Sequence, residues 1–509
     1  MEKFFLHFFS AFYPWFAQML FVAFAAAFVF AFKDIPKAFA GLSSRSLIAL
    51  ALILAAGALV RTYGVPHMHH VFFDEVDHLN IAQNLSVSGR LWMTACGGPG
   101  HCDVGILSFW PPVYHVLLSA LFSVFGFSQP LAFGLTVVLS VLTLALVFVF
   151  VFLLFDDETT ALLAASLFCV LPVHLKYSGT TALEIPSVFF TVLALSCALL
   201  FRKIGKPAFF GMFLSAAGLA VYTRPENVFL LPFFLVCAGR RFRGRDLFFC
   251  GFLALALFLQ IYANIFVFPV PGWSGAWQGA AASVKAHVGA NLASWFLGYF
   301  PWVLTLFAVW GSLVLWKTRR RVFVWAFVWI LFFFLLYASY YIGVSDRYAM
   351  SVYLPLTVLA AAGLKQVWRY LEKKGYLKGL CLAALAVTGY FSFLGLLDPV
   401  FSSPLYREEE FIRASGDLIP ADAYVISANP AIVIVTAQRQ AVQPAVLAEI
   451  DPWPEAIVLF KDLWWHEGVP GQKEVEGRLR REYRARVLAR EPIGQGRSLE
   501  LVLLKKGLT

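Results

Sequence analysis

Residues 46–85 read SLIALALILAAGALVRTYGVPHMHHVFFDEVDHLNIAQNL, an apolar run followed by a polar segment that contains the acidic pair Asp74-Glu75. The apolar part is close to the length of about 20 helical residues that spans a bilayer. Ionisable groups near bilayer depth are costly, and they tend to line polar cavities where transport or chemistry occurs. The stretch therefore predicts a membrane helix followed by a functional loop, although a lone acidic pair can also solvate an interfacial helix.

The whole chain has the composition of an integral membrane protein. Of its 509 residues, 60% are hydrophobic and 14% are charged, and the mean hydropathy is +0.75, which lies outside the range of soluble domains. Seven apolar runs are long enough to span a bilayer, near residues 12–32, 46–63, 129–155, 246–268, 292–316, 322–342 and 378–397. Five shorter or Pro-interrupted runs bring the prediction to about twelve spans: residues 160–176, 185–201, 208–223, 226–239 and 348–364.

The net charge of +10 is a signal of membrane topology rather than of nucleic-acid binding. Basic residues gather in alternate loops: Lys33, Lys37 and Arg45; Arg202, Lys203 and Lys206; Arg240, Arg241, Arg243 and Arg245; Lys317, Arg319, Arg320 and Arg321; and Lys365, Arg369, Lys373, Lys374 and Lys378. The positive-inside rule places these loops in the cytoplasm. By parity, the loops that hold Asp74, Glu184, Arg224 and Arg347, and everything after residue 400, are expected on the extracytoplasmic side.

After residue 400 the composition changes to that of a soluble domain. Helical and strand patterns alternate there, which is typical of a small α/β module. Its 14 Lys and Arg against 15 Asp and Glu leave it nearly neutral, so no nucleic-acid partner is expected. We therefore predict a membrane domain over residues 1–400, with an outer catalytic loop at 61–128, and a soluble extracytoplasmic α/β domain over residues 401–509.

The first outer loop also contains CGGPGHC, in which Cys96 and Cys102 bracket a flexible turn. In an oxidising compartment these two residues could form a disulfide. A bound divalent metal ion is the competing interpretation, because six histidines lie in this region, although their spacings fit no zinc signature. These histidines are His67, His69, His70, His78, His101 and His115.

Five motifs in order resemble the polytopic glycosyltransferases of the GT-C class. They are RTYGVPHMHHVFFDEVDHLNIAQNL from residue 61, FWPPVYHVLLSALFSVFG from 109, KYSGTTALEIPSVFFTVLAL from 176, YTRPENVFLLPFFL from 222 and DRYAMSVYLPLTVLAAAGL from 346. The likeness is strongest to the protein O-mannosyltransferases and the lipid A aminoarabinose transferases. It implies an α-helical polytopic membrane fold with a C-terminal soluble α/β domain, in a bacterial or archaeal cell membrane.

The resemblance also implies a chemistry. Such enzymes transfer a sugar from a polyprenyl-phosphate donor in the bilayer to a lipid or protein acceptor. Asp74, the first residue of the acidic pair, is the expected general base, and Glu75 is expected to assist it. Arg347 and Arg224 are the expected cationic partners of the leaving phosphate.

Three further residues are expected at the donor side of the same site. Glu184 is expected to bind the acceptor, the donor sugar or a metal ion, and Tyr348 and His115 are expected to contact the substrate. A divalent ion held by Asp74, His78 and Glu184 is a further possibility that the resemblance leaves open. No nucleotide or redox cofactor is expected.

One position departs from the family pattern, and some site residues have a second interpretation. Aminoarabinose transferases carry a Lys before the Pro-Pro of FWPPVYH, where this chain has Trp110; His115, Arg224 or a metal ion could supply the missing charge. Arg224 and Arg347 could instead anchor helix ends at the headgroups, and Glu184 could be a first-turn acid. Aromatic residues including Trp110, Tyr114, Trp273 and Trp277 are interpreted as an interfacial belt.

DLWWHEG at residues 462–468 is similar to the acceptor motif of oligosaccharyltransferases. His466 stands in place of the Asp of that motif, and the chain is short for that family. We therefore interpret this similarity as coincidence.

Two other functional classes remain open. A secondary transporter would also have about twelve spans, but it typically shows two matching halves, which this sequence lacks. A non-catalytic membrane scaffold would not need Asp74, Glu184 and Arg347 to converge.

Overall fold

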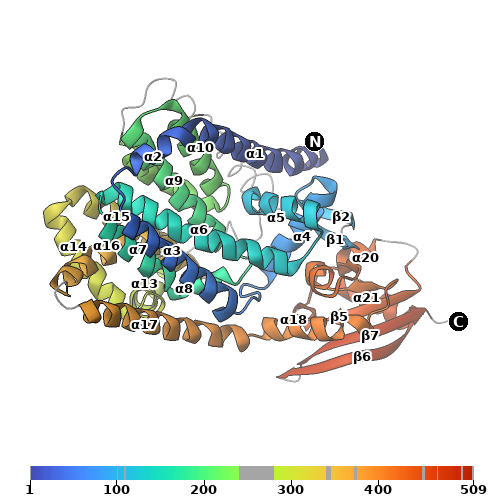
Figure 1. Cartoon of the computed structure of the whole chain (residues 1–509). Helices are drawn as coiled ribbons and strands as arrows, with labels where there is room; N and C mark the ends of the chain where they lie inside the picture. Colours follow the sequence, from blue (N-terminus) through green and yellow to red (C-terminus); the bar gives the residue numbers. More distant parts are fainter. Residues whose placement is uncertain are drawn as a thin grey trace.

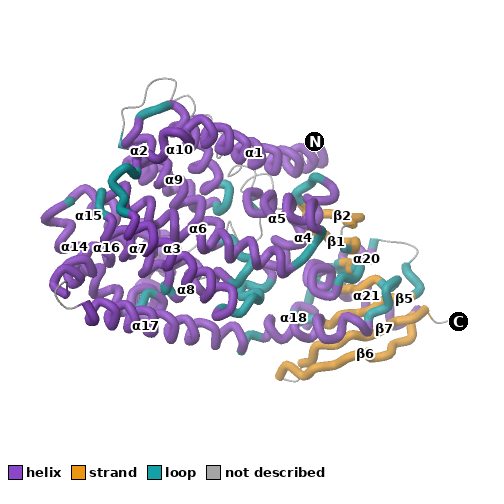
Figure 2. Tube along the Cα trace, in the orientation of Figure 1, coloured by secondary structure: helices purple, strands orange, loops and turns teal. Residues whose placement is uncertain are grey.

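The protein was analysed as a computed structural model that describes residues 2–99, 101–107, 110–239, 251, 280–339, 345–371, 375–449, 453–466, 468–494 and 497–506. A bundle of helices forms most of the molecule, and a sheet domain caps one end of it (Figure 1). The strands lie at that end, together with shorter helices (Figure 2). The expected combination of a polytopic helical fold with a C-terminal α/β domain is confirmed.

Seven helical segments are long and apolar enough to cross a membrane: Ala11–Ala38, Ser44–Gly64, Gln129–Phe155, Glu184–Ile204, Arg320–Ala338, Asp346–Tyr370 and Ala383–Phe401. Two bent helix pairs raise the number to nine among the described residues: Glu158–Cys169 with Pro172–Ser178, and Ala286–Tyr299 with Trp302–Thr318. Three shorter apolar helices are Pro112–Phe125, Pro207–Val221 and Glu226–Ala238. Every other predicted span corresponds to one of these segments, but the span at 246–268 lies outside the described residues apart from residue 251. The basic cluster at 240–245, Trp273 and Trp277 also lie outside them. The count of twelve stays a prediction.

The helices of the bundle begin and end as follows: α1 (Glu2–Ala31), α3 (Ser44–Leu59), α4 (Phe73–Ser88), α5 (Pro112–Phe125), α6 (Gln129–Phe155), α7 (Glu158–Cys169), α8 (Pro172–Ser178), α9 (Glu184–Ile204), α10 (Pro207–Val221), α11 (Leu231–Ala238), α13 (Ala280–Ala293), α14 (Trp302–Thr318), α15 (Arg320–Ala338), α16 (Asp346–Tyr370) and α17 (Gly375–Phe401). The most apolar windows of α9 and α16 are 89% and 78% buried inside the protein, against 11% for the window in Ser44–Gly64. α9 and α16 are therefore central helices, and each carries predicted site residues in its first turn.

Glycines fix how closely α16 approaches its neighbour α14. A Cβ atom at Gly311 of α14 would collide with the carbonyl oxygen of Leu359, and one at Gly363 of α16 would collide with the carbonyl oxygen of Phe307. Small residues that let helix backbones meet are the usual means of packing helices in lipid, where apolar burial gives little preference for one partner over another. This contact sets the position of the helix that begins at Asp346.

The sheet has seven strands in the order β2-β1-β4-β3-β5-β7-β6. Its strands are β1 (Trp92–Gly98), β2 (His101–Leu107), β3 (Tyr424–Ile426), β4 (Ala441–Val442), β5 (Ala456–Lys461), β6 (Tyr483–Gly494) and β7 (Arg497–Lys506). β4, β3 and β5 run parallel, whereas β1 pairs with β4 antiparallel through Cys96 opposite Val442 and Gly97 opposite Ala441. The hairpin of the first outer loop is thus continuous with the terminal sheet, so the sheet crosses the predicted boundary at residue 400.

The helices of the terminal domain are α18 (Pro404–Ser415), α19 (Pro430–Ile432), α20 (Pro444–Ala448) and α21 (Gln472–Glu482). The terminal domain shares a hydrophobic core with α4. Val76 and Leu79 of α4 lie in the same buried cluster as Phe411 of α18 and Ile434. α4 is therefore enclosed between the helical bundle and the terminal domain, which explains how a helix with many polar residues can be largely buried.

The predicted disulfide is not formed in the structure. Cys96 and Cys102 are both free thiols, because the hairpin register sets Cys102 opposite Gly97 and Cys96 opposite Val104.

Candidate active site

The acidic pair lies in the first turn of α4, but its two carboxylates have different surroundings. Glu75 is fully buried. It accepts hydrogen bonds of 2.7 Å from the backbone N–H groups of His70, Val71 and Thr181. Burial raises the pKa of Glu75 by more than His69 and these hydrogen bonds lower it. Glu75 therefore ties the segment before α4 and the segment before α9 to α4, and its catalytic assignment stays a prediction.

The backbone just before α4 is held in an unusual conformation. Phe72, which precedes the helix, has φ of +42° and ψ of −92°, and its side chain is buried. Non-glycine residues with positive φ are uncommon, and strained backbone of this kind concentrates at functional sites. The strain is consistent with a loop that is fixed by its contacts to Glu75.

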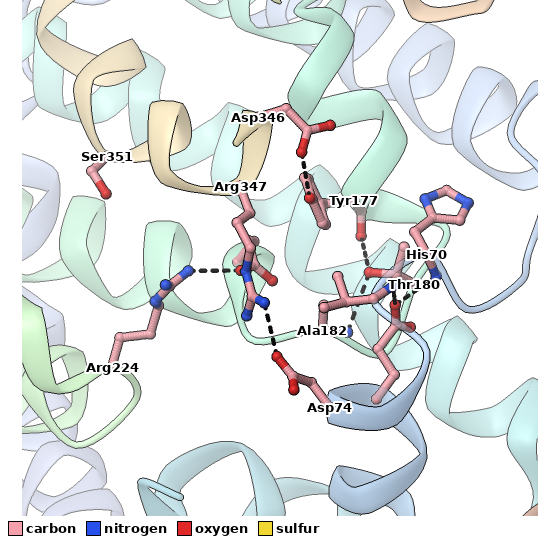
Figure 3. Close-up of polar contacts among 12 residues, drawn as sticks. His70, Asp74, Tyr177, Thr180, Ala182, Arg224, Asp346, Arg347 and Ser351 are labelled. Carbon is pink, nitrogen blue, oxygen red and sulfur yellow. Dashed lines mark hydrogen bonds and ion pairs between the residues drawn. The ribbon is translucent and has the colours of Figure 1, made fainter. Parts of the chain in front are cut away.

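Asp74 contacts Arg347, which belongs to a distant helix (Figure 3). Arg347, in the first turn of α16, donates from Nη1 to Asp74 Oδ2 over 2.8 Å and from Nε to Glu184 Oε1 over 2.9 Å. Arg224 donates from Nη1 to the same Glu184 oxygen over 2.7 Å. The structure thus brings together four of the predicted site residues, which come from segments up to 273 positions apart.

The burial of these residues decides between function and anchoring. Glu184 is 1% and Arg224 is 9% exposed, and both arginines are bonded to carboxylates rather than reaching toward headgroups. Arg224 also forms an ion pair with Glu226, whose carboxylate accepts a hydrogen bond from Tyr337. The snorkelling interpretation of the two arginines is therefore wrong in this structure.

Tyr348 lies beside the charged cluster, and its contact with a substrate stays a prediction. Its ring stacks on that of Tyr337 with centroids 4.6 Å apart and planes 11° apart, and the Arg347 guanidinium lies 5.8 Å from its centroid. Tyr348 therefore supports the cluster from beside Arg347.

A second group of contacts holds the start of α16. Asp346 accepts hydrogen bonds from Lys176 Nζ over 2.5 Å and from Tyr177 Oη over 2.9 Å. Lys176 and Tyr177 lie on α8, and the same segment continues through Thr181 to Glu184. Residues 176–184 therefore connect α4, α9 and α16 at one point, and they fix Arg347 through its neighbour.

His78, which lies one helical turn after Asp74 on α4, pairs with His115. His115 Nδ1 lies 3.0 Å from the carbonyl oxygen of Pro111, and its Nε2 lies 3.1 Å from His78 Nδ1. Because a carbonyl only accepts, His115 carries its proton on Nδ1, and His78 must then donate from Nδ1. Burial, with smaller contributions from His115 and Arg347, holds the pKa of His78 well below its ordinary value. His115 therefore contacts His78 rather than Asp74, Glu184 or the two arginines.

The donor set does not fit the metal ion that was considered from the sequence. Asp74 and Glu184 are joined through Arg347, whereas His78 is bonded to His115. Within the described residues, no three His, Cys, Asp or Glu side chains come together as metal ligands do.

Neither Trp110 nor Tyr114 belongs to an interfacial belt, because Tyr114 is fully buried and the Trp110 ring packs edge-on against His78 with a centroid distance of 5.0 Å.

A pocket begins at the charged cluster and continues between the central helices. Glu184, Arg224 and Arg347 line its charged part, and Glu184 Oε2 has no hydrogen-bond partner among the described residues. Hydroxyl and amide groups line its middle, and the remaining wall is apolar: Val188, Leu230, Trp329, Met350 and Leu354. The cavity that these groups surround is small, about 20 Å³, which is room for a water molecule.

The terminal domain reaches the same loop. His69 Nδ1 lies 3.0 Å from Glu409 Oε2 of α18, and both side chains are buried. The ring of Phe73, which immediately precedes Asp74, packs edge-on against Trp464 with centroids 5.4 Å apart. No sequence pattern connects these residues, because Glu409 stands in the run REEE, which is typical of a solvated helix. By contrast, Lys176, Thr181 and Glu226 stand within the quoted motifs and could have been singled out there.

Comparisons with known proteins agree with this architecture. Residues 110–262 match the family model described as dolichyl-phosphate-mannose-protein mannosyltransferase. The fold is similar to that of ArnT from Cupriavidus metallidurans, whose crystal structure was determined bound to undecaprenyl phosphate: the TM-score is 0.59 and the identity 12%, over 90% of this chain and 98% of that chain. No curated protein sequence matches the chain. The resemblance of this chain to the GT-C class of polyprenyl-phosphate-sugar-dependent glycosyltransferases is therefore confirmed.

Proposed function

We propose that the chain is an integral membrane glycosyltransferase that moves a sugar from a polyprenyl-phosphate donor to a hydroxyl of a lipid or protein acceptor. The observation that carries the proposal is the meeting of Asp74 Oδ2 with Arg347 Nη1 at 2.8 Å, because Arg347 also lines the pocket with the apolar wall. A base and a cation are the two groups that this transfer needs at one place.

The groups of the cluster have separate tasks in the reaction. Asp74 accepts the proton of the acceptor hydroxyl as its oxygen bonds to the anomeric carbon. The bond between that carbon and the phosphate oxygen breaks, and its electron pair stays with the polyprenyl phosphate. Arg347 and Arg224 stabilise the negative charge that grows on this leaving group. Glu184 Oε2, which is buried and without a described partner, accepts a hydrogen bond from a hydroxyl of the donor sugar.

The pocket supports a lipid donor in particular. The cavity must widen to admit a donor, but its lining combines cations that suit a phosphate with an apolar wall that suits a prenyl chain, including Leu230, Trp329 and Leu354. All three side chains belong to segments of the helical bundle. A water-soluble nucleotide sugar would gain nothing from such a wall.

The distribution of charge supports an extracytoplasmic site. α9 begins at Glu184 and carries Arg202 and Lys203 in its last turn, so the site and a basic loop lie at opposite ends of a helix about 30 Å long. α16 likewise begins at the site and carries Arg369 in its last turn. The positive-inside rule then assigns the site to the face opposite the cytoplasm.

The proposal is tested with purified protein in liposomes and a panel of polyprenyl-phosphate sugars, with thin-layer separation of the lipids. We expect one donor to lose its sugar to a co-purified or added acceptor. Asp74→Asn, which keeps the side-chain volume, should reduce the rate about 100-fold to 10,000-fold, the range for loss of a general base. Asp398→Asn, which changes an exposed acid of α17, is the matched control and should retain full activity.

Two results would contradict the proposal. One is near-normal transfer by a folded Asp74→Asn protein. The other is uptake of a sugar or lipid into the liposomes with no new glycosidic bond, which is the result expected of a transporter.

A further inference from the structure

The guanidinium of Arg347 is already engaged by carboxylates on the edges with which it could hold a phosphate. A guanidinium binds phosphate oxygens best in a fork, through either Nη1 with Nη2 or Nε with Nη2. Here Nη1 donates to Asp74 over 2.8 Å and Nε donates to Glu184 over 2.9 Å. A phosphate that approaches either fork therefore lies beside a carboxylate already bonded to one of the two nitrogens, and the two like charges repel.

Burial decides which carboxylate is displaced more easily. The Glu184 side chain is fully buried, and its Oε1 also accepts a hydrogen bond from Arg224 Nη1 over 2.7 Å. Moving Glu184 would break two charge-assisted bonds and leave a buried charge without a partner, which is costly. The Asp74 side chain is 27% exposed and can be solvated when it leaves. The fork of Nη1 and Nη2 is thus the one that opens.

Arg224 offers no easier alternative. Its Nε and Nη2 both donate to Glu226 Oε1, over 2.7 Å and 2.6 Å, and its Nη1 donates to Glu184. At either fork of Arg224 a phosphate would lie beside a carboxylate that is held by more than one bond and so yields less easily. Arg224 therefore adds charge to the site without presenting the first fork.

We infer that the donor phosphate displaces Asp74 from Arg347, so that one event both seats the donor and frees the general base. The inference rests on the proposed function. While the donor is absent, the base is paired with the cation that will bind the phosphate, and this pairing makes Asp74 a weaker proton acceptor. The exchange imposes an order in which the donor binds first.

The inference makes an unusual prediction for a residue placed in the catalytic machinery. Asp74 competes with the phosphate for Nη1, so Asp74→Asn should bind a polyprenyl phosphate more tightly than the wild type while it loses transfer. We expect the dissociation constant for undecaprenyl phosphate to fall about 5-fold to 50-fold, the effect of removing one partly exposed charge-assisted hydrogen bond from the free protein. The measurement is a titration of purified protein in detergent with undecaprenyl phosphate.

A double-mutant cycle identifies the source of the gain. In an Arg347→Ala background the competition no longer exists, so adding Asp74→Asn should leave the affinity unchanged. Asp398→Asn is the matched control and should bind as the wild type does. If Asp74→Asn fails to fold in a thermal-unfolding check, Asp74→Ala replaces it, because it removes the same charge.

Two outcomes would overturn the inference, and a third would contradict the proposed function. Affinity that is equal to or weaker than that of the wild type in a folded Asp74 variant overturns the inference. A gain that persists with Arg347→Ala overturns it as well, because the competition would then lie elsewhere. A wild-type protein that binds no polyprenyl phosphate contradicts the proposed function itself.

Discussion

Glu409→Gln should weaken the attachment of the terminal domain to the catalytic loop. His69 Nδ1 and Glu409 Oε2 lie 3.0 Å apart with their side chains 0% and 5% exposed, and removing one partner of a buried ion pair typically costs about 3–5 kcal/mol. Gln keeps an oxygen that accepts from His69, and the change also removes a contact of Glu409 with the half-exposed Arg413. We therefore expect a loss of about 2–3 kcal/mol in the stability of this contact.

The pH dependence follows from the direction of the two pKa shifts. Burial lowers the pKa of His69, but the carboxylates of Glu409 and Glu75 raise it by more, so the pKa of folded His69 lies above its ordinary value of 6.5. The contribution of His69 to stability is then complete below pH 6.5, and it is lost as the pH rises through the raised pKa. Burial raises the pKa of Glu409 and His69 lowers it by more, so Glu409 remains ionised throughout this window.

The assay is thermal unfolding in detergent between pH 6 and pH 9, together with hydrogen exchange of residues 65–75. The wild type should lose stability across this window, and Glu409→Gln should be less stable at pH 6 and differ less at pH 9. Glu410→Gln is the matched control, because Glu410 is 46% exposed and also pairs with Arg413. Equal pH slopes for the wild type and Glu409→Gln would refute the reasoning.

Three further predictions concern the site and its hairpin. Arg347→Lys should keep a folded protein but weaken undecaprenyl phosphate binding about tenfold or more, approaching Arg347→Ala, because an ammonium cannot form a fork; wild-type affinity in the Lys variant would show that charge alone suffices. Asp346→Asn should lower kcat more than it raises KM for the donor, because it loosens Arg347 without touching substrate, and Asp346→Glu should recover part of the rate; an unchanged kcat would contradict this positioning role. Cys96 and Cys102, which are free thiols in the structure, should both react with a maleimide after denaturation without reduction, whereas resistance of both would favour the disulfide expected from the sequence.

The order of motifs along the chain predicted the fold class, and the residues it singled out at Asp74, Glu184 and Arg347 lie together in the structure. Asp74, Glu184 and Arg347 each follow an apolar span, so parity alone assigned them to one membrane face. Their pairing could not be predicted, because Asp74 and Arg347 are 273 positions apart and no local pattern fixes which side chain faces which. Glu75 shows the same limit, since its partner Thr181 is 106 positions away.

The contribution of the terminal domain was harder to predict for a physical reason. β4 is two residues long, too short to give an alternating pattern, yet it joins the hairpin of the first outer loop to the terminal sheet. Glu409 reads as a solvated helical acid until that sheet packs against α4 and buries it. A predicted boundary at residue 400 follows the change in composition, whereas the hydrogen bonds of the sheet cross it.

The most direct test is an experimental structure of the protein with undecaprenyl phosphate. The account predicts phosphate oxygens about 3 Å from the Nη atoms of Arg347, with the Asp74 carboxylate moved off Nη1 and the prenyl chain against Leu230 and Leu354. A phosphate bound at the opposite, basic end of the bundle, for instance near Lys365, would contradict it, as would a bound phosphate that leaves the 2.8 Å contact between Asp74 and Arg347 intact.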